Sequence, residues 1–198
     1  SLGLIRRLWT EERVTHHGRF YRITDAGAGA KPVRPEGMPV WIAAQADAAV
    51  KRAAALGDAW VVIPSMGFDE LAASMKLYRA TLRALGKPDP SDFPITRECY
   101  VGTSQASALD ECREALEFKY SAYAKWGLDA AQDSAEGSGF DKMVRDCFII
   151  GDKAFVRDEI ARYRETIGIN HFIMRLHWPG LPQERVLYSM RALADIFA

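Results

Sequence analysis

Arg175, His177 and Trp178 stand together where a predicted strand ends, and their types suit the binding of a small substrate. The apolar run at residues 169–176 predicts that strand. Alternate strand residues point to opposite faces, so Arg175 and His177 share one face. The other face is apolar and suits packing against helices (Phe172, Met174 and Leu176). We expect a substrate pocket here. The alternative is that Arg175 forms a structural ion pair and His177 is a solvated loop residue.

Arg97 and Glu98 form a second charged feature, in the middle of a strand predicted at residues 93–101. Burying charges in mid-strand is costly unless they are paired. Because neighbouring strand residues face opposite ways, the two side chains cannot share a face. Each residue therefore either binds substrate or fixes the fold through ion pairs, and the sequence leaves both interpretations open.

Ala44, Gln45 and Ala46 occupy the junction between a strand predicted at residues 39–45 and a helix predicted at 46–56. Small side chains there let a ligand approach the backbone, and the free N–H groups at a helix N-terminus favour phosphate. By contrast, the glycines at residues 27–29 do not lead directly into a helix, which indicates a surface loop rather than a dinucleotide-binding turn.

Other catalytic patterns cannot be assembled from this sequence. Neither a Ser-His-Asp arrangement nor a phosphate-binding P-loop is found, and no residue is assigned as the catalytic base. The three cysteines are widely spaced (Cys99, Cys112 and Cys147). That spacing predicts no zinc site. Free thiols used as small apolar packing groups fit a reducing cytoplasm.

The predicted elements alternate between strand and helix. Strands at residues 39–45, 58–63, 93–101 and 169–176 are separated by helices, an order typical of a parallel α/β sheet with helical crossovers. Four such units are half of a (β/α)8 TIM barrel, a fold that needs about 250 residues. A four-stranded open sheet is the alternative.

We expect residues 1–198 to form a single domain. Within it, the polar, glycine-rich region at 127–147 predicts a mobile insertion or lid. A helix begins at once, at residues 2–9, and no Met precedes it. This start favours a trimmed or cleaved chain.

Composition narrows the classes of partner. Lys plus Arg and Asp plus Glu both number 26, so the formal net charge is zero. Such a balance does not favour nucleic acid or an anionic membrane surface as a partner. No apolar run approaches the roughly 20 residues of a membrane span.

Several segments together resemble the bacterial-luciferase-like family of flavin-dependent monooxygenases and oxidoreductases. Their order and spacing extend over nearly the whole chain (residues 4–9, 18–21, 39–45, 52–60, 150–152, 168–175 and 178–180). The resemblance implies a (β/α)8 barrel of which this chain supplies the C-terminal half, about strands five to eight. Members use reduced FMN or the deazaflavin F420 at the C-terminal face of the strands.

The resemblance also implies roles for particular residues. Ala44, Gln45 and Ala46 match the end of the fifth strand, which contacts the cofactor phosphate in the family. A serine or glycine pair often stands there, whereas this chain has Gln45 and Ala46, which removes a hydroxyl donor. The substrate pocket would take one residue near the seventh strand and three at the end of the eighth (Arg97, and Arg175, His177 and Trp178).

From these observations we expect a reduced-FMN-dependent monooxygenase that acts on a small organic substrate with O2, with a separate flavin reductase as a candidate partner. The alternatives are an F420-dependent oxidoreductase that transfers hydride, a catalytically silent half-barrel with a structural or interaction role, and an unrelated small α/β ligand-binding domain. A half-barrel exposes two sheet edges and an apolar lumen. We therefore expect a homo-oligomer, or pairing with the family's N-terminal half.

Overall fold

The computed structural model describes residues 1–127 and 138–197. An N-terminal part comes first, with a helix and a two-stranded antiparallel hairpin (α1 Leu2–Thr10, β1 Val14–His17, β2 Arg22–Ala26). Strands and helices then alternate (β3 Trp41–Ala43, α2 Asp47–Leu56, β4 Ala59–Val61, α3 Phe68–Ala84, β5 Pro94–Val101, α4 Gln105–Lys125, α6 Ser138–Cys147, β6 Ile149–Gly151, α7 Lys153–Ile167, β7 His171–Arg175, α8 Gln183–Phe197).

The strands from β3 to β7 are parallel, as the alternating order predicted. β3 pairs with β4, a single bridge joins β4 to β5 through Val62 and Ile95, and β5 pairs with β7. Ser104 and Asp152 accept backbone N–H groups at the starts of α4 and α7, and so act as the N-caps of these helices.

β6 is a fifth parallel strand, where the sequence predicted four. Val62 donates its N–H to the carbonyl of Pro94, and Thr96 donates to that of Val62, each at 2.9 Å. The even-numbered backbone groups of β5 therefore face β4. Gly102 donates to Gly151 at 2.9 Å, so β6 lies on the same edge as β4, beyond the point where β4 leaves it. β7 occupies the opposite edge.

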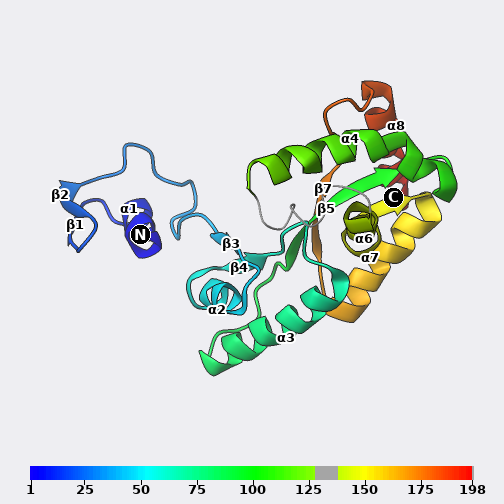
Figure 1. Ribbon diagram of the computed structural model, residues 1–198. Helices are drawn as coiled ribbons and strands as arrows, with labels where there is room; N and C mark the ends of the chain where they lie inside the picture. Colours follow the sequence, from blue (N-terminus) through cyan, green and yellow to red (C-terminus); the bar gives the residue numbers. More distant parts are fainter. Residues whose placement is uncertain (128–137, 198) are drawn as a thin grey trace.

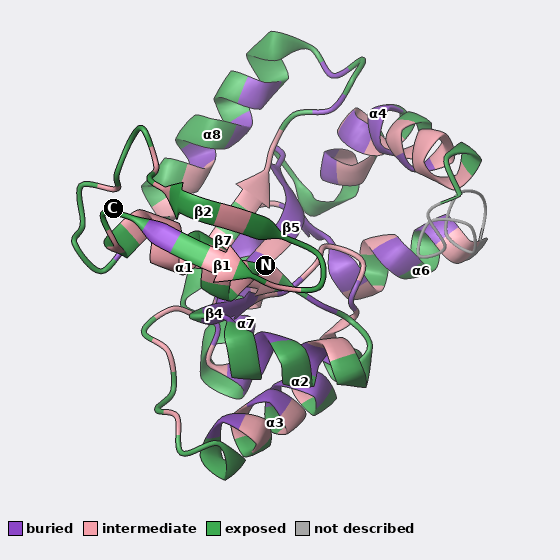
Figure 2. Cartoon of the chain, turned by 90° about the vertical axis from the view of Figure 1, so that its left-hand side faces the viewer, coloured by how far each residue is buried: buried purple, intermediate pink, exposed green. Residues whose placement is uncertain are grey.

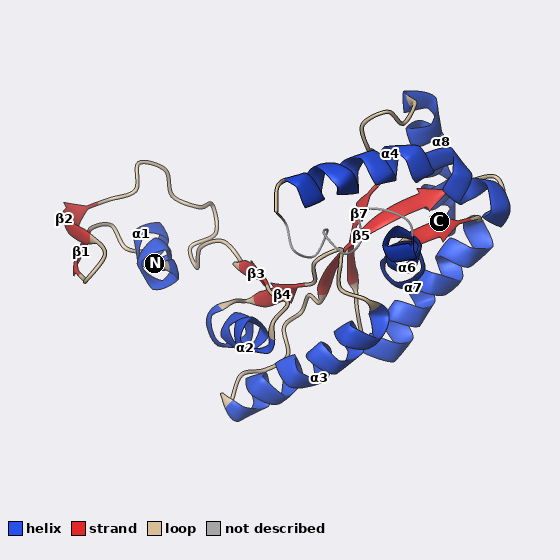
Figure 3. Ribbon diagram, in the orientation of Figure 1, coloured by secondary structure: helices blue, strands red, loops and turns tan. Residues whose placement is uncertain are grey.

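Helices cover both faces of the central strand β5 (Figure 3). On one face Ile95, Cys99 and Val101 join a core that includes side chains of α2, α3 and α7. On the other face Tyr100 packs with side chains of α4 and α6. Burial is concentrated on β5 and on the inward sides of these helices (Figure 2). Phe172, Met174 and Leu176 pack against the first core, as the alternation predicted.

The second part of the insertion expected at residues 127–147 has regular secondary structure. Residues 138–147 form helix α6, in which Phe140, Met143 and Cys147 are buried. These apolar side chains recur at helical spacing and anchor the segment. The expectation of a mobile segment also falls on residues 128–137, which lie outside the described residues.

The N-terminal part lies to one side of the sheet (Figure 1). Its first helix, α1, has no buried residue, and Arg6 pairs with Asp58 at 2.8 Å. None of the described helices has an apolar stretch that would suffice to cross a bilayer.

Candidate active site

The carboxyl ends of parallel strands lie at one edge of an α/β sheet, where ligands of such folds bind. β3 ends at Ala43, β4 at Val61 and β7 at Arg175. The amide Nε2 of Gln45 donates to Oε1 of Glu70 at 3.3 Å. This bond links the segment after β3 to the first turn of α3, so two of the strand ends share one surface.

The segment Ala44–Ala46 sits as the sequence predicted, between β3 and α2. Ala44 is buried, and its carbonyl accepts the indole N–H of Trp60 at 2.9 Å, which fixes the end of the strand. Gln45 and Ala46 are exposed. Ala46 is the N-cap of α2, and no side chain caps that end. Methyl-sized side chains and uncapped N–H groups fit a flat, phosphate-bearing cofactor, although Asp47 in the first turn opposes an anion.

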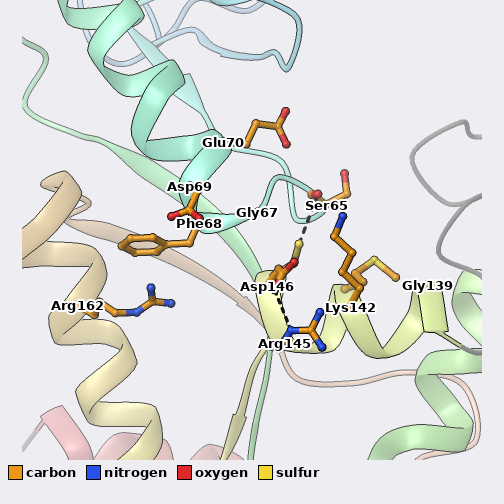
Figure 4. Close-up of a pocket in the computed structure, with 12 residues that line it drawn as sticks. Ser65, Gly67, Phe68, Asp69, Glu70, Gly139, Lys142, Arg145, Asp146 and Arg162 are labelled. Carbon is orange, nitrogen blue, oxygen red and sulfur yellow. Dashed lines mark hydrogen bonds and ion pairs between the residues drawn. The ribbon is translucent and has the colours of Figure 1, made fainter.

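A pocket of about 610 Å³ opens beside this segment, among the loop after β4, the start of α3, α6 and one residue of α7 (Figure 4). Its charged lining is mixed: three cations (Lys142, Arg145 and Arg162) and three acids (Asp69, Glu70 and Asp146). Arg162 lies over the ring of Phe68, with 3.6 Å from guanidinium carbon to ring centroid, and pairs with Glu159 at 2.7 Å. Sequence reasoning missed this pocket, because residues 138–147 were assigned to an insertion and no helix was predicted there.

Glu98 and Arg175 form the second feature of this edge. They are register partners on β5 and β7, so their side chains share a face. Glu98 has no exposed surface. Its Oε1 accepts from Lys119 at 2.5 Å, Tyr120 at 3.0 Å and Arg175 at 3.3 Å, and its Oε2 accepts from Trp178 at 2.5 Å. The structure thus brings Arg175 and Trp178 together around a carboxylate.

The protonation states in this cluster follow from burial. Burial, together with the carboxylate of Glu98, raises the pKa of Tyr120 far above its usual value, so its hydroxyl stays a donor. Burial lowers the pKa of Lys119, and Glu98 counteracts that effect. The cluster therefore depends on the negative charge of Glu98 to keep two cations in place.

The structure does not bring Arg97 to this cluster. Arg97 is fully buried, on the face of β5 that packs against α3 and α7. Nε donates to the Tyr163 hydroxyl at 3.1 Å, and the two Nη atoms donate to the carbonyls of Ile63, Pro64 and Met66 at 3.1, 3.3 and 2.8 Å. The physical reason is strand alternation, which turns Arg97 away from Glu98. In this arrangement Arg97 holds the loop after β4 rather than a ligand.

His177 is exposed, and its side chain makes no hydrogen bond or ion pair with any residue in the described ranges. The three cysteines are all buried. Burial raises the pKa of Cys99 to about 12 and that of Cys147 to about 11, so neither thiol forms a nucleophilic thiolate near neutral pH. Within the described residues no group of His, Cys, Asp or Glu could hold a metal ion.

Comparison with known proteins places this geometry in a family. The family model described as luciferase-like monooxygenase matches residues 1–171. An F420-dependent glucose-6-phosphate dehydrogenase of Amycolatopsis mediterranei is 27% identical over 94% of this chain and 56% of its own length. The enzyme of the same description from Mycobacterium tuberculosis is 28% identical over the same shares. The chain thus spans little more than half the length of these relatives.

Solved structures show the same α/β fold. A monooxygenase from Streptomyces bottropensis superposes with a TM-score of 0.78 at 23% identity, over 98% of this chain and 57% of its own. An F420-dependent secondary alcohol dehydrogenase, solved with an F420-acetone adduct, gives 0.75 at 18% identity over 98% and 58%. The oxygenating constituent of a Pseudomonas putida 3,6-diketocamphane monooxygenase with FMN gives 0.74 at 15% identity over 98% and 60%.

Proposed function

Because the chain belongs to the luciferase-like monooxygenase family, we propose that it is part of an F420-dependent oxidoreductase that transfers hydride to or from a small organic substrate. The observation that carries this choice is the similarity, at 25–28% identity over at least 94% of the chain, to relatives described as F420-dependent. The superposed structures fall under 25% identity and include both F420 and FMN proteins.

The second candidate is the reduced-FMN monooxygenase that the sequence predicted. A monooxygenase superposes with a TM-score of 0.78, and an FMN complex with 0.74. In this function the protein would use O2 and receive reduced FMN from a separate reductase. In both candidates the cofactor would occupy the same position. They differ in what reacts with the cofactor, which is an organic substrate for F420 and O2 for reduced FMN.

The described residues have definite tasks under either candidate. When bound, the cofactor would supply or accept the reducing equivalents. The segment Ala44–Ala46, of which Gln45 and Ala46 are exposed, would face it, with backbone N–H groups of α2 directed at its phosphate. Trp60 holds that segment through the Ala44 carbonyl at 2.9 Å. Arg175, anchored by Glu98, would hold the substrate.

We also propose that this chain forms only part of a complete barrel. The chain matches 56% of the length of its relative, and we take its four main strands as the C-terminal half of a (β/α)8 barrel. On the side of β7 that faces Glu98, Ile173 is 37% exposed. Pairing with the family's N-terminal half, or with a second copy of the chain, would cover that surface.

A turnover assay tests the choice between the candidates. The protein is given oxidised F420 without O2, together with glucose 6-phosphate or a secondary alcohol, the substrates named for its relatives. Loss of the F420 absorbance with one of them supports hydride transfer. An oxygenated substrate that forms only with reduced FMN and O2 would overturn the F420 proposal in favour of the monooxygenase.

A pair of substitutions at Ala46 tests the cofactor position. Ala46→Asp puts a carboxylate at the uncapped N-terminus of α2. It should stabilise the protein by about 1 kcal/mol, because aspartate is a good N-cap. It should also weaken cofactor binding at least tenfold, because the negative charge of the carboxylate repels the phosphate. Thermal unfolding and a cofactor titration measure the two effects.

Ala46→Ser is the matched control, since it caps the helix without adding charge. It should stabilise the protein to a similar degree and leave cofactor affinity unchanged or improved. Equal cofactor affinity in the Asp and Ser variants would place the phosphate elsewhere.

A further inference from the structure

The cluster around Glu98 carries more positive than negative charge. One carboxylate faces two cations, Lys119 and Arg175, both within hydrogen-bond distance. Four donors converge on its two oxygens, three on Oε1 and one on Oε2. Glu98 therefore serves as a buried acceptor that holds these side chains in place.

The excess charge resides on Arg175. The side chain of Lys119 is only 10% exposed and lies against two aromatic rings, those of Tyr120 and Tyr123. The side chain of Arg175 is 39% exposed. Among residues 1–127 and 138–197 it donates a single hydrogen bond, from Nη1 to Glu98. Most of its planar array of N–H donors thus remains available to a ligand.

An exposed aliphatic residue lies next to Arg175 on the same face. Two register positions back along the strands, Ile173 pairs with Thr96, and Ile173 is 37% exposed. A guanidinium beside an exposed aliphatic side chain suits a molecule with an anionic group attached to a carbon skeleton.

We propose that Arg175, positioned by buried Glu98, binds the carboxylate or phosphate group of the substrate, so that this enzyme acts on small organic anions. That the bound anion is the substrate of an enzyme rests on the proposed function, whereas the anion site itself follows from the cluster around Glu98. Glu98 is a positioning residue here, because it acts only through Arg175.

The indole N–H of Trp178 reports on this site, since it donates to Glu98 at 2.5 Å. Its NMR resonance, assigned with Trp178→Phe, is followed during titration of the cofactor-free protein with acetate and, separately, methyl phosphate. Ionic strength is held constant with chloride. We expect a saturable shift, and the anion with the lower Kd identifies the preferred group.

Arg175→Gln should raise that Kd at least tenfold, Arg175→Lys should raise it less, and the exposed control Arg157→Gln should leave it unchanged. Glu98→Gln should raise the Kd, because Arg175 loses the carboxylate that positions it. A Kd unaffected by Arg175→Gln, or the absence of a saturable shift in the wild-type protein, would overturn the proposal even if Glu98→Gln fails to fold.

Cofactor titrations separate this inference from the proposed function. Anion binding should persist when the protein is saturated with cofactor. Competition between methyl phosphate and the cofactor would assign Arg175 to the cofactor and overturn the substrate inference, while the proposed function would stand. Anion binding through Arg175 in a protein that binds neither F420 nor FMN would leave the anion site in place and remove the proposed function.

Discussion

Glu98→Ala should lower the free energy of unfolding by about 3–5 kcal/mol. The substitution leaves Lys119, which is 10% exposed, without its counter-charge. It also removes the acceptor of the buried Trp178 indole. A buried charge that loses its partner costs far more than an exposed one, because water cannot replace the lost interaction. Urea denaturation followed by circular dichroism measures the change.

The matched control is Glu117→Ala, which breaks the exposed pair between Arg113 and Glu117 at 3.1 Å. Surface pairs contribute about 0–1 kcal/mol, so this variant should unfold close to the wild type. If Glu98→Ala and Glu117→Ala have equal effects, Glu98 does not hold the cluster together.

Arg97→Met should cost about 3 kcal/mol, because it removes the guanidinium donor from the partly buried carbonyls of Ile63 and Pro64 and from the buried carbonyl of Met66. No carboxylate among the described residues pairs with Arg97, so these carbonyl dipoles are what stabilises its charge. Arg97→Lys should recover only part of the loss, since an ammonium cannot reproduce the planar fork. The variants are compared by urea denaturation and by limited proteolysis at residues 62–67.

Arg157→Met serves as the control for Arg97, because Arg157 is exposed and pairs with its exposed neighbour Asp158. It should change stability by less than about 0.5 kcal/mol. An Arg97→Met protein as stable as the wild type, with a loop no more open to protease, would refute the structural role assigned to Arg97.

Strand periodicity predicted the orientation of β7 correctly, because the two faces of this strand differ sharply in polarity. Phe172 and Met174 pack toward the helices, and Arg175 lies on the other face. The same rule placed Arg97 and Glu98 on opposite faces of β5, but it did not predict which of them faces α7 and which faces α4. That choice depends on partners far away in sequence, Tyr163 for Arg97 and Trp178 for Glu98. The alternation of residues along one strand gives no information about such distant contacts.

The pocket beside α6 was harder to predict. Phe140, Met143 and Cys147 follow a helical period, and all are buried. This signal was present, but the preceding glycine- and serine-rich stretch suggested a loop. The cations that line the pocket, Lys142 on α6 and Arg162 on α7, come together only through the packing of these helices around β6.

The most direct test of the account is a parallel fluorescence titration of the protein with F420 and FMN. The account predicts saturable binding, with F420 bound more tightly and its affinity reduced at least tenfold by Ala46→Asp. Tighter binding of FMN would favour the monooxygenase. If neither cofactor binds, even when the chain is joined to the N-terminal half of the family's barrel, the oxidoreductase account is contradicted and a structural or interaction role takes its place.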